Sequence, residues 1–444
     1  MYAPWLGGGF RTDDFVHLGW LADAHSFTAL FASTDAFGFY RPVTQASLKL
    51  DASVFGESAA GFRAVNLALH AGVIGAAFVV ARLVSAGPLA AALATIAFAL
   101  TPKAHPTAVL WVSGRAELLM ALFSFVATAG WIVWSRNGRA WWLAVATAAY
   151  IAAVASKETA FLLPLLFLAT PSATRPWRLR CGAVLMLLGV SALMFVWRSK
   201  VGALPPFSAD EHYTLATGVA RIVRSIGNYT PRMAPAPAAL VILIGAAGFL
   251  ASGHRTEGTG SFATTWLRGR GVAISLFSLA WVAVFLAPVL PIVLRSELYL
   301  YLPVFGGCVL AASIADSLMR GVEKHRAVVA AIGFWVIGLG VYQMARSVEV
   351  HRDHEFSARF VAALRERDDL AGQSRPVAVV PGDARTERFL KDAIDWTLPA
   401  VLHVALGGRP RATIEYTGMP ATPNAIRLAC EYRDGTVTLR RLGP

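Results

Sequence analysis

The sequence predicts an all-α polytopic membrane protein of about ten transmembrane helices, followed by a small α/β domain at the C-terminus. Hydrophobic residues make up 56% of the 444 residues and charged residues only 15%. The mean hydropathy is +0.54, and the apolar residues gather in long runs. These values exclude a single soluble domain and are typical of a multi-pass membrane protein. From about residue 346 onward hydropathy falls and charge rises, which indicates the soluble domain.

The basic balance of the chain reflects membrane topology. The formal net charge is +13, which is also common in proteins that bind nucleic acid. Here the basic residues lie in short turns between apolar runs and form no stripe with interleaved aromatic residues. We therefore expect a membrane lipid environment and no nucleic-acid partner.

Ten apolar runs are candidate spans, some of them short enough to be tilted or closely paired. They lie near residues 65–84, 87–101, 116–134, 139–155, 158–170, 181–198, 236–251, 271–294, 298–315 and 327–345. The chain is thus expected to divide into a first extracytoplasmic loop (1–64), a transmembrane helical domain (65–345) and a soluble domain (346–444).

Alternate turns between the runs carry the positive charge. The turns contain Arg136 and Arg139; Arg175, Arg178 and Arg180; Arg255, Arg268 and Arg270; and Arg320, Lys324 and Arg326. Short basic loops face the cytoplasm. The opposite loops hold nearly all the carboxylates, so we expect the functional site and the C-terminal domain on the extracytoplasmic face, in a bacterial inner membrane.

The C-terminal segment alternates strand and helix signals. Residues 375–381 and 411–416 read as strands and residues 386–394 as a helix. Residues 425–432 and 436–441 flank the dipeptide Asp434-Gly435, a strong hairpin signal. A small α/β domain follows from this pattern.

Two adjacent carboxylates, Asp13 and Asp14, stand in the first segment. Like charges close together, when partly desolvated, raise one pKa and so produce a general base. Alternatively the pair caps a helix, because the apolar residues that follow have helical spacing. The pair alone leaves both interpretations open.

Two further features of the early chain have a functional and a structural interpretation. Tyr40 and Arg41 precede a proline, which holds a guanidinium on a restricted backbone suited to forked contacts with a phosphate; an interfacial anchor is the alternative. Asn66 and His70 share one face at the start of the first span. That face either packs against other helices or lines a site.

Three charged clusters then recur at helix entries on the same side of the membrane. They are His105 with Arg115 and Glu117, Lys157 with Glu158, and Arg295 with Glu297. Each alone is consistent with charged side chains that extend to the interface. Three clusters on one face favour a functional site. In this interpretation Arg41, Arg115, Lys157 and Arg295 bind a phosphate. The side chains that line the site are then Tyr40, Asn66, His70, His105, Glu117, Glu158 and Glu297.

Six motifs resemble those of one family in the same order. They are Asp13-Asp14, Tyr40–Thr44, Asn66–His70, Trp111–Leu119, Ser156–Thr159 and Ser296–Pro303. Over residues 11 to 305 the chain resembles the membrane part of the transmembrane tetratricopeptide-repeat O-mannosyltransferases, within the GT-C glycosyltransferases that include the protein O-mannosyltransferases. The family's leading span and its repeats have no counterpart, so we expect an additional hydrophobic helix upstream of Met1.

This resemblance implies an integral membrane glycosyltransferase with a GT-C-like fold. Such an enzyme moves a sugar, mannose in the resembling family, from a polyprenyl-phosphate donor to an extracytoplasmic hydroxyl of a protein or glycan, with inversion. By similarity the acidic pair supplies the base, with Asp13 ahead of Asp14. A phosphate leaving group needs only cations to stabilise it, so no cofactor is certain, and a divalent metal is left open.

Two classes of function other than a glycosyltransferase make different predictions about the sequence. A transporter or flippase of lipid-linked glycan predicts ionisable residues deep in the spans or broken helices in two related halves. A non-catalytic membrane scaffold predicts a tail that binds a partner. The charges gather at helix ends on one face, which favours the enzyme.

Overall fold

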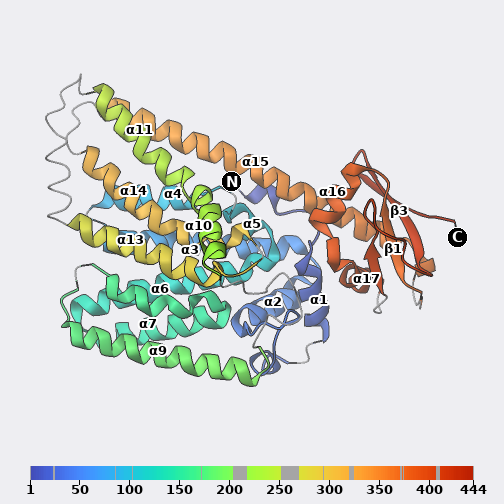
Figure 1. The fold of residues 1–444 in the computed structure, drawn as a ribbon, viewed down its shortest axis with the longest axis horizontal. Coiled ribbons are helices and arrows are strands. Elements are labelled where there is room, and N and C mark those ends of the chain that lie inside the picture. Colours follow the sequence, from blue (N-terminus) through green and yellow to red (C-terminus); the bar gives the residue numbers. More distant parts are fainter. Residues whose placement is uncertain are drawn as a thin grey trace.

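The computed structural model is a long helical bundle with a four-stranded sheet at one end (Figure 1). The residues that it describes are 2–23, 26–85, 87–102, 104–171, 173–203, 218–251, 270–293, 295–319, 325–370, 373, 375–406 and 411–443. Arg255, Arg268, Arg320 and Lys324, which contribute to the expected basic turns, lie outside these residues.

Helices account for most of the described chain. The α-helices are α1 (Asp13–Asp23), α2 (Pro42–Phe55), α3 (Ala59–Val84), α4 (Pro88–Ala99), α5 (Ala104–Leu110), α6 (Arg115–Asn137), α7 (Ala140–Ser156), α8 (Leu163–Leu166), α9 (Trp177–Lys200), α10 (Val219–Met233), α11 (Pro235–Ala251), α13 (Arg270–Leu286), α14 (Pro303–Met319), α15 (His325–Arg365), α16 (Ala384–Ala393) and α17 (Leu398–Leu406). Short 3₁₀ turns join them, among them η3 (Val112–Gly114), η4 (Glu158–Leu162), η5 (Phe167–Ala169), η7 (Ala287–Val289), η8 (Glu297–Leu300) and η10 (Asp395–Thr397).

Each of the ten predicted apolar runs contains helical structure among its described residues. Six helices are long and apolar enough to cross a membrane, and the pair α10 and α11, bent by 53°, gives up to seven spans. Pro88–Ala99, Ala140–Ser156 and Glu158–Ala169 are shorter apolar helices. The prediction of a multi-pass helical membrane protein with a small C-terminal sheet is therefore confirmed.

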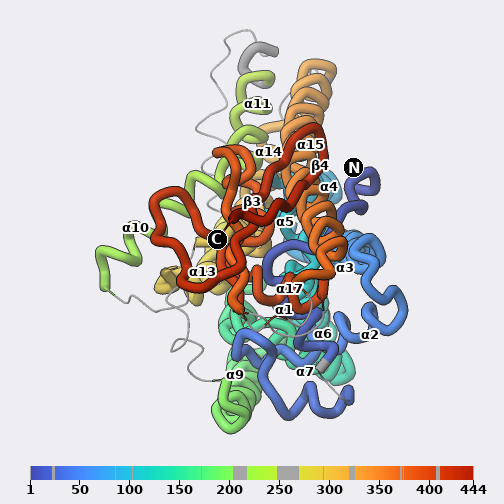
Figure 2. Tube along the Cα trace, turned by 90° about the vertical axis from the view of Figure 1, so that its right-hand side faces the viewer, coloured from blue at the N-terminus to red at the C-terminus, as the bar shows by residue number. Residues whose placement is uncertain are grey.

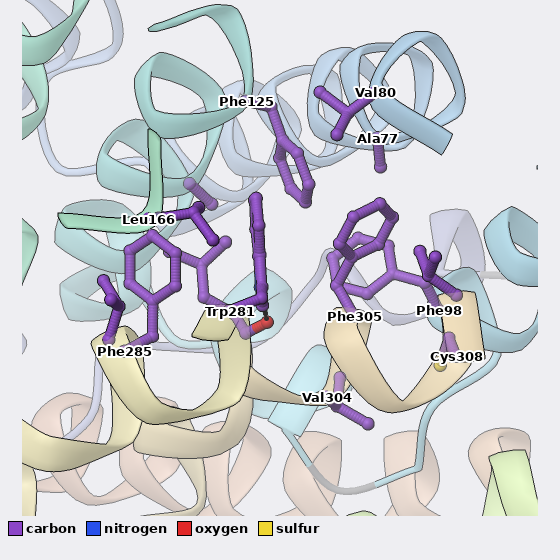
Figure 3. Packing of buried hydrophobic residues seen from close by; sticks show 14 of the residues in the cluster. Ala77, Val80, Phe98, Phe125, Leu166, Trp281, Phe285, Val304, Phe305 and Cys308 are labelled. Atoms are coloured by element: carbon purple, nitrogen blue, oxygen red, sulfur yellow. Dashed lines mark hydrogen bonds between the residues drawn. The ribbon is translucent and has the colours of Figure 1, made fainter. Parts of the chain in front are cut away.

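Some helices form the centre of the bundle and others its surface. The apolar windows of α14 and α6 are 83% and 72% buried, whereas those of α9 and α15 are 22% and 17% buried. Aromatic rings fill the centre: Phe125 of α6, Trp281 of α13 and Phe305 of α14 each contact the other two (Figure 3). The outer helices instead expose large apolar side chains such as Leu193 and Phe334, as expected for surfaces that face lipid.

Helix α15 joins the bundle to the C-terminal domain without a break (Figures 1 and 2). Its 41 residues correspond to roughly 60 Å, about twice the hydrocarbon thickness of a bilayer. The second half carries Phe356, Phe360 and Leu364 into the core of the C-terminal domain. The boundary expected between residues 345 and 346 falls inside this helix.

The C-terminal domain contains a mixed sheet in the order β2-β1-β3-β4. Strands β1 (Val377–Pro381), β2 (Ala412–Ile414) and β3 (Ile426–Arg433) are parallel, and β4 (Thr436–Arg441) pairs with β3 in the opposite direction. Asp434 and Gly435 at the β3–β4 turn have φ values of 47° and 75°, as a type I′ turn requires. The predicted strands, the helix over residues 386–394 and the hairpin are confirmed.

The first 64 residues, called the first segment from here on, lie between the bundle and the C-terminal domain (Figure 1). They contain α1, α2 and the first turns of α3. The guanidinium of Arg63 in α3 is fully buried and donates hydrogen bonds to the carbonyl oxygens of Leu6, Gly7, Gly8 and Gly9 and of Leu110. Buried backbone carbonyls need such donors. The side chain of Arg63 therefore connects the N-terminal residues 6–9 to α3 and α5.

Candidate functional site

A cavity of about 740 Å³ lies where the bundle, the first segment and the C-terminal domain meet. Its lining comes from six regions of the chain, residues 11–41, 111–117, 157–162, 195–198, 287–299 and 391–396. The residues are Arg11, Thr12, Asp13, His17, Phe37, Phe39, Arg41, Trp111, Ser113, Ala116, Glu117, Lys157, Glu158, Thr159, Phe161, Leu162, Phe195, Arg198, Ala287, Pro288, Pro291, Ile292, Ser296, Leu298, Tyr299, Lys391, Asp392, Asp395 and Trp396. Apolar side chains from bundle helices and charged side chains from the helix ends thus share one space.

Asp13 is the first residue of α1 and lines the cavity. In the described part of the chain its carboxylate forms no hydrogen bond with another side chain. Burial and the neighbouring Asp14 carboxylate raise the pKa of Asp13 to about 7, although Arg11 acts in the opposite direction. A carboxylate with a pKa near neutrality is suited to general-base chemistry.

Asp14 has different surroundings. It is 1% exposed, and its carboxylate accepts hydrogen bonds from the Ser113 amide at 2.8 Å, the Ser113 hydroxyl at 2.5 Å and the Arg11 amide at 3.1 Å. Burial raises the pKa of Asp14, and the contacts with Ser113 oppose that rise. Its side chain joins α1 to η3 and does not line the cavity. The amides from which it accepts hydrogen bonds belong to Ser113 and Arg11, outside α1, so these contacts differ from the helix cap that was the alternative interpretation.

Arg41 and Glu158 form a forked ion pair on the cavity wall. The Arg41 Nη2 and Nε atoms lie 2.5 and 2.9 Å from the two Glu158 oxygens. Arg198, near the end of α9, lies 3.8 Å from the same carboxylate and donates to the Tyr40 carbonyl at 2.9 Å. Two guanidinium groups thus share one carboxylate, which leaves positive charge directed at the cavity.

Lys157 adds a third cation. Its ammonium pairs with Glu117 and lies 5.1 Å from the centre of the Tyr299 ring. All three of these residues line the cavity. Together Arg41, Arg198 and Lys157 face the carboxylates of Glu158 and Glu117, and the buried Asp35 carboxylate also acts on Arg41 and Arg198. Three cations therefore gather on this wall among acidic partners.

Arg115 lies elsewhere. It is fully buried and pairs with Asp51 of α2 at 2.5 Å, while its other donors reach Asn66, the Ser47 hydroxyl at 2.6 Å and the Phe62 carbonyl at 3.0 Å. Arg115 was predicted to bind the donor phosphate, but it is not among the residues that line the cavity. It joins α2, α3 and α6 instead.

The remaining predicted residues also lie outside the cavity lining. Asn66 donates to the Trp111 carbonyl at 3.0 Å, His70 contacts the Tyr301 hydroxyl at 2.7 Å, and His105 packs against the Tyr301 ring at 4.4 Å. These contacts are with neighbouring helices and the turns that join them. The Tyr40 hydroxyl donates to the Phe31 carbonyl. Glu297 contacts Arg346 at 3.4 Å, and Arg295 is exposed.

Several lining residues were not predicted from the sequence. Arg198 ends an apolar span, where a basic residue is ordinary. Arg11, paired with Asp353 at 3.5 Å, and Lys391, Asp392, Asp395 and Trp396 come from segments without a distinctive local pattern. Buried Asp35 accepts the Phe37 and Phe39 amides at 2.9 Å each and so holds the aromatic loop against the cavity.

Within the described ranges, no group of three or more histidine, cysteine, aspartate or glutamate side chains is placed to hold a metal ion.

No protein-family model matches the sequence, and no curated protein matches it. Solved structures do. ArnT from Cupriavidus metallidurans bound to undecaprenyl phosphate is 14% identical, with 98% of this chain and 96% of that chain covered and a TM-score of 0.48. The Archaeoglobus fulgidus oligosaccharyltransferase in complex with zinc and sulfate is 10% identical, covering 91% and 59%, with a TM-score of 0.52. The same archaeal enzyme, AglB, in complex with an inhibitory peptide and a dolichol-phosphate is 11% identical, covering 91% and 61%, with a TM-score of 0.48.

The similarity to the oligosaccharyltransferase structure with zinc and sulfate shows the fold alone. The chain is a multi-pass helical membrane protein whose fold is similar to that of this archaeal structure. It spans about three-fifths of the archaeal oligosaccharyltransferase.

Proposed function

We propose that this protein is an integral membrane glycosyltransferase that moves a sugar from a polyprenyl-phosphate donor to an acceptor hydroxyl, with inversion. The observation that carries the proposal is the cavity itself. It combines a carboxylate with a pKa near 7 at Asp13, a cationic wall at Arg41, Arg198 and Lys157, and apolar side chains from bundle helices. Base, phosphate counter-charge and a lipid-compatible surface are the three things this reaction requires.

Asp13 is assigned the general base. It accepts the proton of the acceptor hydroxyl while that oxygen forms a bond to the anomeric carbon. The bond between the anomeric carbon and the phosphate oxygen breaks, and polyprenyl phosphate leaves with the electron pair. Attack opposite the leaving group inverts the anomeric configuration.

The cationic wall is assigned to the phosphate. A sugar phosphodiester carries negative charge, with which the guanidinium and ammonium groups of the wall form favourable ion pairs. The charge on phosphate grows as the bond breaks, so cations fixed in advance stabilise the transition state more than the ground state. Forked guanidinium groups also suit phosphate geometry.

The donor sugar and the side of the membrane are parts of the same proposal. The resemblance to O-mannosyltransferases makes mannose the first sugar to test, and the basic turns favour an extracytoplasmic site.

The testing experiment incubates the purified protein with a panel of undecaprenyl-phosphate hexoses and with acceptors that carry a free hydroxyl, namely methyl glycosides and hexapeptides that contain serine or threonine. It follows undecaprenyl phosphate by mass spectrometry. Release from at least one donor, lost in Asp13→Asn, supports the proposal. Release from none of them contradicts it. Because side chains supply the counter-charge, turnover should persist in EDTA; activity abolished by EDTA and restored by Mg²⁺ would overturn that part.

A further inference from the structure

One wall of the cavity comes from the C-terminal domain and has no role in the chemistry above. It is the turn at the end of α16 and in η10, which contributes Lys391, Asp392, Asp395 and Trp396. Trp396 is 53% exposed. Large exposed aromatic side chains inside a concave site commonly contact ligands, so this turn is a candidate binding surface.

The turn lies next to the proposed base. The Trp396 ring meets the Phe37 ring edge-on at 6.0 Å, and Phe37 meets His17 at 5.0 Å. His17 follows Asp13 by four residues on α1, so the two share one face of the helix. An unbroken line of contacts therefore runs from the turn to the residue beside the base.

The backbone fixes this arrangement. The Thr12 amide donates to the Ala393 carbonyl at 2.9 Å, which joins the acidic motif directly to the turn. Thr12 and Asp395 have φ values of 40° and 45°, a left-handed region that is unfavourable for residues other than glycine and is concentrated at functional sites. Both strained residues line the cavity.

The turn also presents polar groups for a ligand. One oxygen of Asp395 accepts the Tyr416 hydroxyl at 2.8 Å. Its second oxygen and the ammonium of Lys391 form no hydrogen bond or ion pair with any residue that the structure describes. An acceptor, a donor and an aromatic face are thus available together on one short segment.

We propose that this turn is the acceptor subsite and that the acceptor is a saccharide; the inference rests on the proposed function. A pyranose ring has a face of C–H groups that packs on an aromatic ring and hydroxyls that donate to carboxylates and accept from ammonium groups. A peptide acceptor would instead find extended partners, commonly the edge of a sheet. Within the described residues, none of the cavity-lining side chains belongs to β1, β2, β3 or β4.

The experiment measures binding to the purified full chain by saturation-transfer NMR. The probes are the methyl glycosides of glucose, galactose, mannose and N-acetylglucosamine, together with hexapeptides that contain serine or threonine. We expect saturation transfer to at least one glycoside and to no peptide. Trp396→Ala should weaken glycoside binding about tenfold or more, Trp396→Phe should restore part of it, and Asp395→Asn should weaken it as well.

The matched control is Trp177→Ala, because Trp177 is similarly exposed at 57% but begins α9 away from the cavity. Its glycoside binding should equal that of the unaltered protein. Binding that Trp396→Ala leaves intact, peptide binding in place of glycoside binding, or no binding at all would each overturn the saccharide subsite. Donor turnover is measured separately, so a chain that binds glycosides but releases no undecaprenyl phosphate would contradict the proposed function alone.

Discussion

Asp13 and Asp14 are neighbours in the chain, yet their carboxylates have different surroundings. Asp13 lines the cavity, while Asp14 accepts three hydrogen bonds that hold α1 to the turn before α6. The sequence predicts the pair and, through the family resemblance, a preference for the first residue. It does not predict Ser113 as the partner of Asp14, because the two lie 99 residues apart and no local pattern joins them.

The raised pKa of Asp13 predicts a pH dependence. A base acts only when deprotonated, so kcat/KM should be nearly constant above pH 7 and fall about tenfold for each pH unit below it. Burial and Asp14 both raise this pKa to about 7. A pH–rate profile measured at subsaturating donor concentration checks this, and a flat profile between pH 5 and 8 would contradict it.

Asp14→Asn should behave as a structural change. The substitution weakens an acceptor of three hydrogen bonds in a buried position, so the free energy of unfolding should fall by about 1 to 3 kcal/mol. Turnover per folded molecule should fall much less than in Asp13→Asn. Thermal unfolding and an active-site titration separate the two effects; an unchanged melting temperature with lost turnover would assign Asp14 to the chemistry.

Of the cations predicted to bind phosphate, Arg41 lines the cavity and Arg115 is buried in a structural ion pair, and substitutions should distinguish these two roles. Arg41→Gln removes a forked cation from the cavity wall, so the donor KM should rise roughly tenfold or more. The double variant Arg41→Gln with Glu158→Gln leaves no unpaired carboxylate there and should keep the raised KM with near-normal stability. Arg115→Gln breaks the buried pair with Asp51 and should cost about 3 to 5 kcal/mol of stability. A normal donor KM in both Arg41 variants would contradict the phosphate assignment.

At the scale of elements, α15 connects the bundle to the domain that completes the cavity. An apolar run is visible in the local sequence, so the sequence predicts the membrane span of α15. The helix continues without a break to Arg365 because Phe356, Phe360 and Leu364 pack against strands that come much later in the chain, and the local sequence does not show this. The same limit explains why Arg198 and the turn around Trp396 were not predicted. Their role comes only from tertiary contacts.

A break in α15 should uncouple the C-terminal domain from the acidic motif. Ala345 is exposed within this helix, so Ala345→Pro disturbs the backbone alone and kinks it. Turnover should fall at least about tenfold while the protein still inserts, because the contact between Thr12 and Ala393 requires both parts in place. Ala345→Gly, which costs about 1 kcal/mol without a kink, is the control. Normal turnover in Ala345→Pro would contradict the coupling.

At the scale of the whole molecule, four helices begin at one end of the bundle and approach the cavity at the other. The basic residues Arg139, Arg180, Arg270 and Arg326 stand at or near the start of α7, α9, α13 and α15. Lys157 follows the end of α7 at the cavity, and the seventeen residues of α7 span about 25 Å. Basic turns and cavity therefore lie at opposite ends.

This arrangement predicts topology. Reporters fused after Arg139, Arg180, Arg270 and Arg326 should be cytoplasmic, whereas a reporter on the C-terminal domain should not. Cysteine labelling with a membrane-impermeant reagent gives an independent measurement. A cytoplasmic C-terminal domain would contradict the proposed extracytoplasmic site.

The central claim is that Asp13 is the base, and Asp13→Asn tests it most directly. Asparagine keeps the size of the side chain, and in the described chain Asp13 forms no hydrogen bond with another side chain, so membrane insertion and melting temperature should be unchanged. Loss of a general base typically costs about 10²- to 10⁴-fold in rate. We predict that donor binding is retained while release of undecaprenyl phosphate falls at least about a hundredfold. Turnover equal to that of the unaltered protein would remove Asp13 from the mechanism.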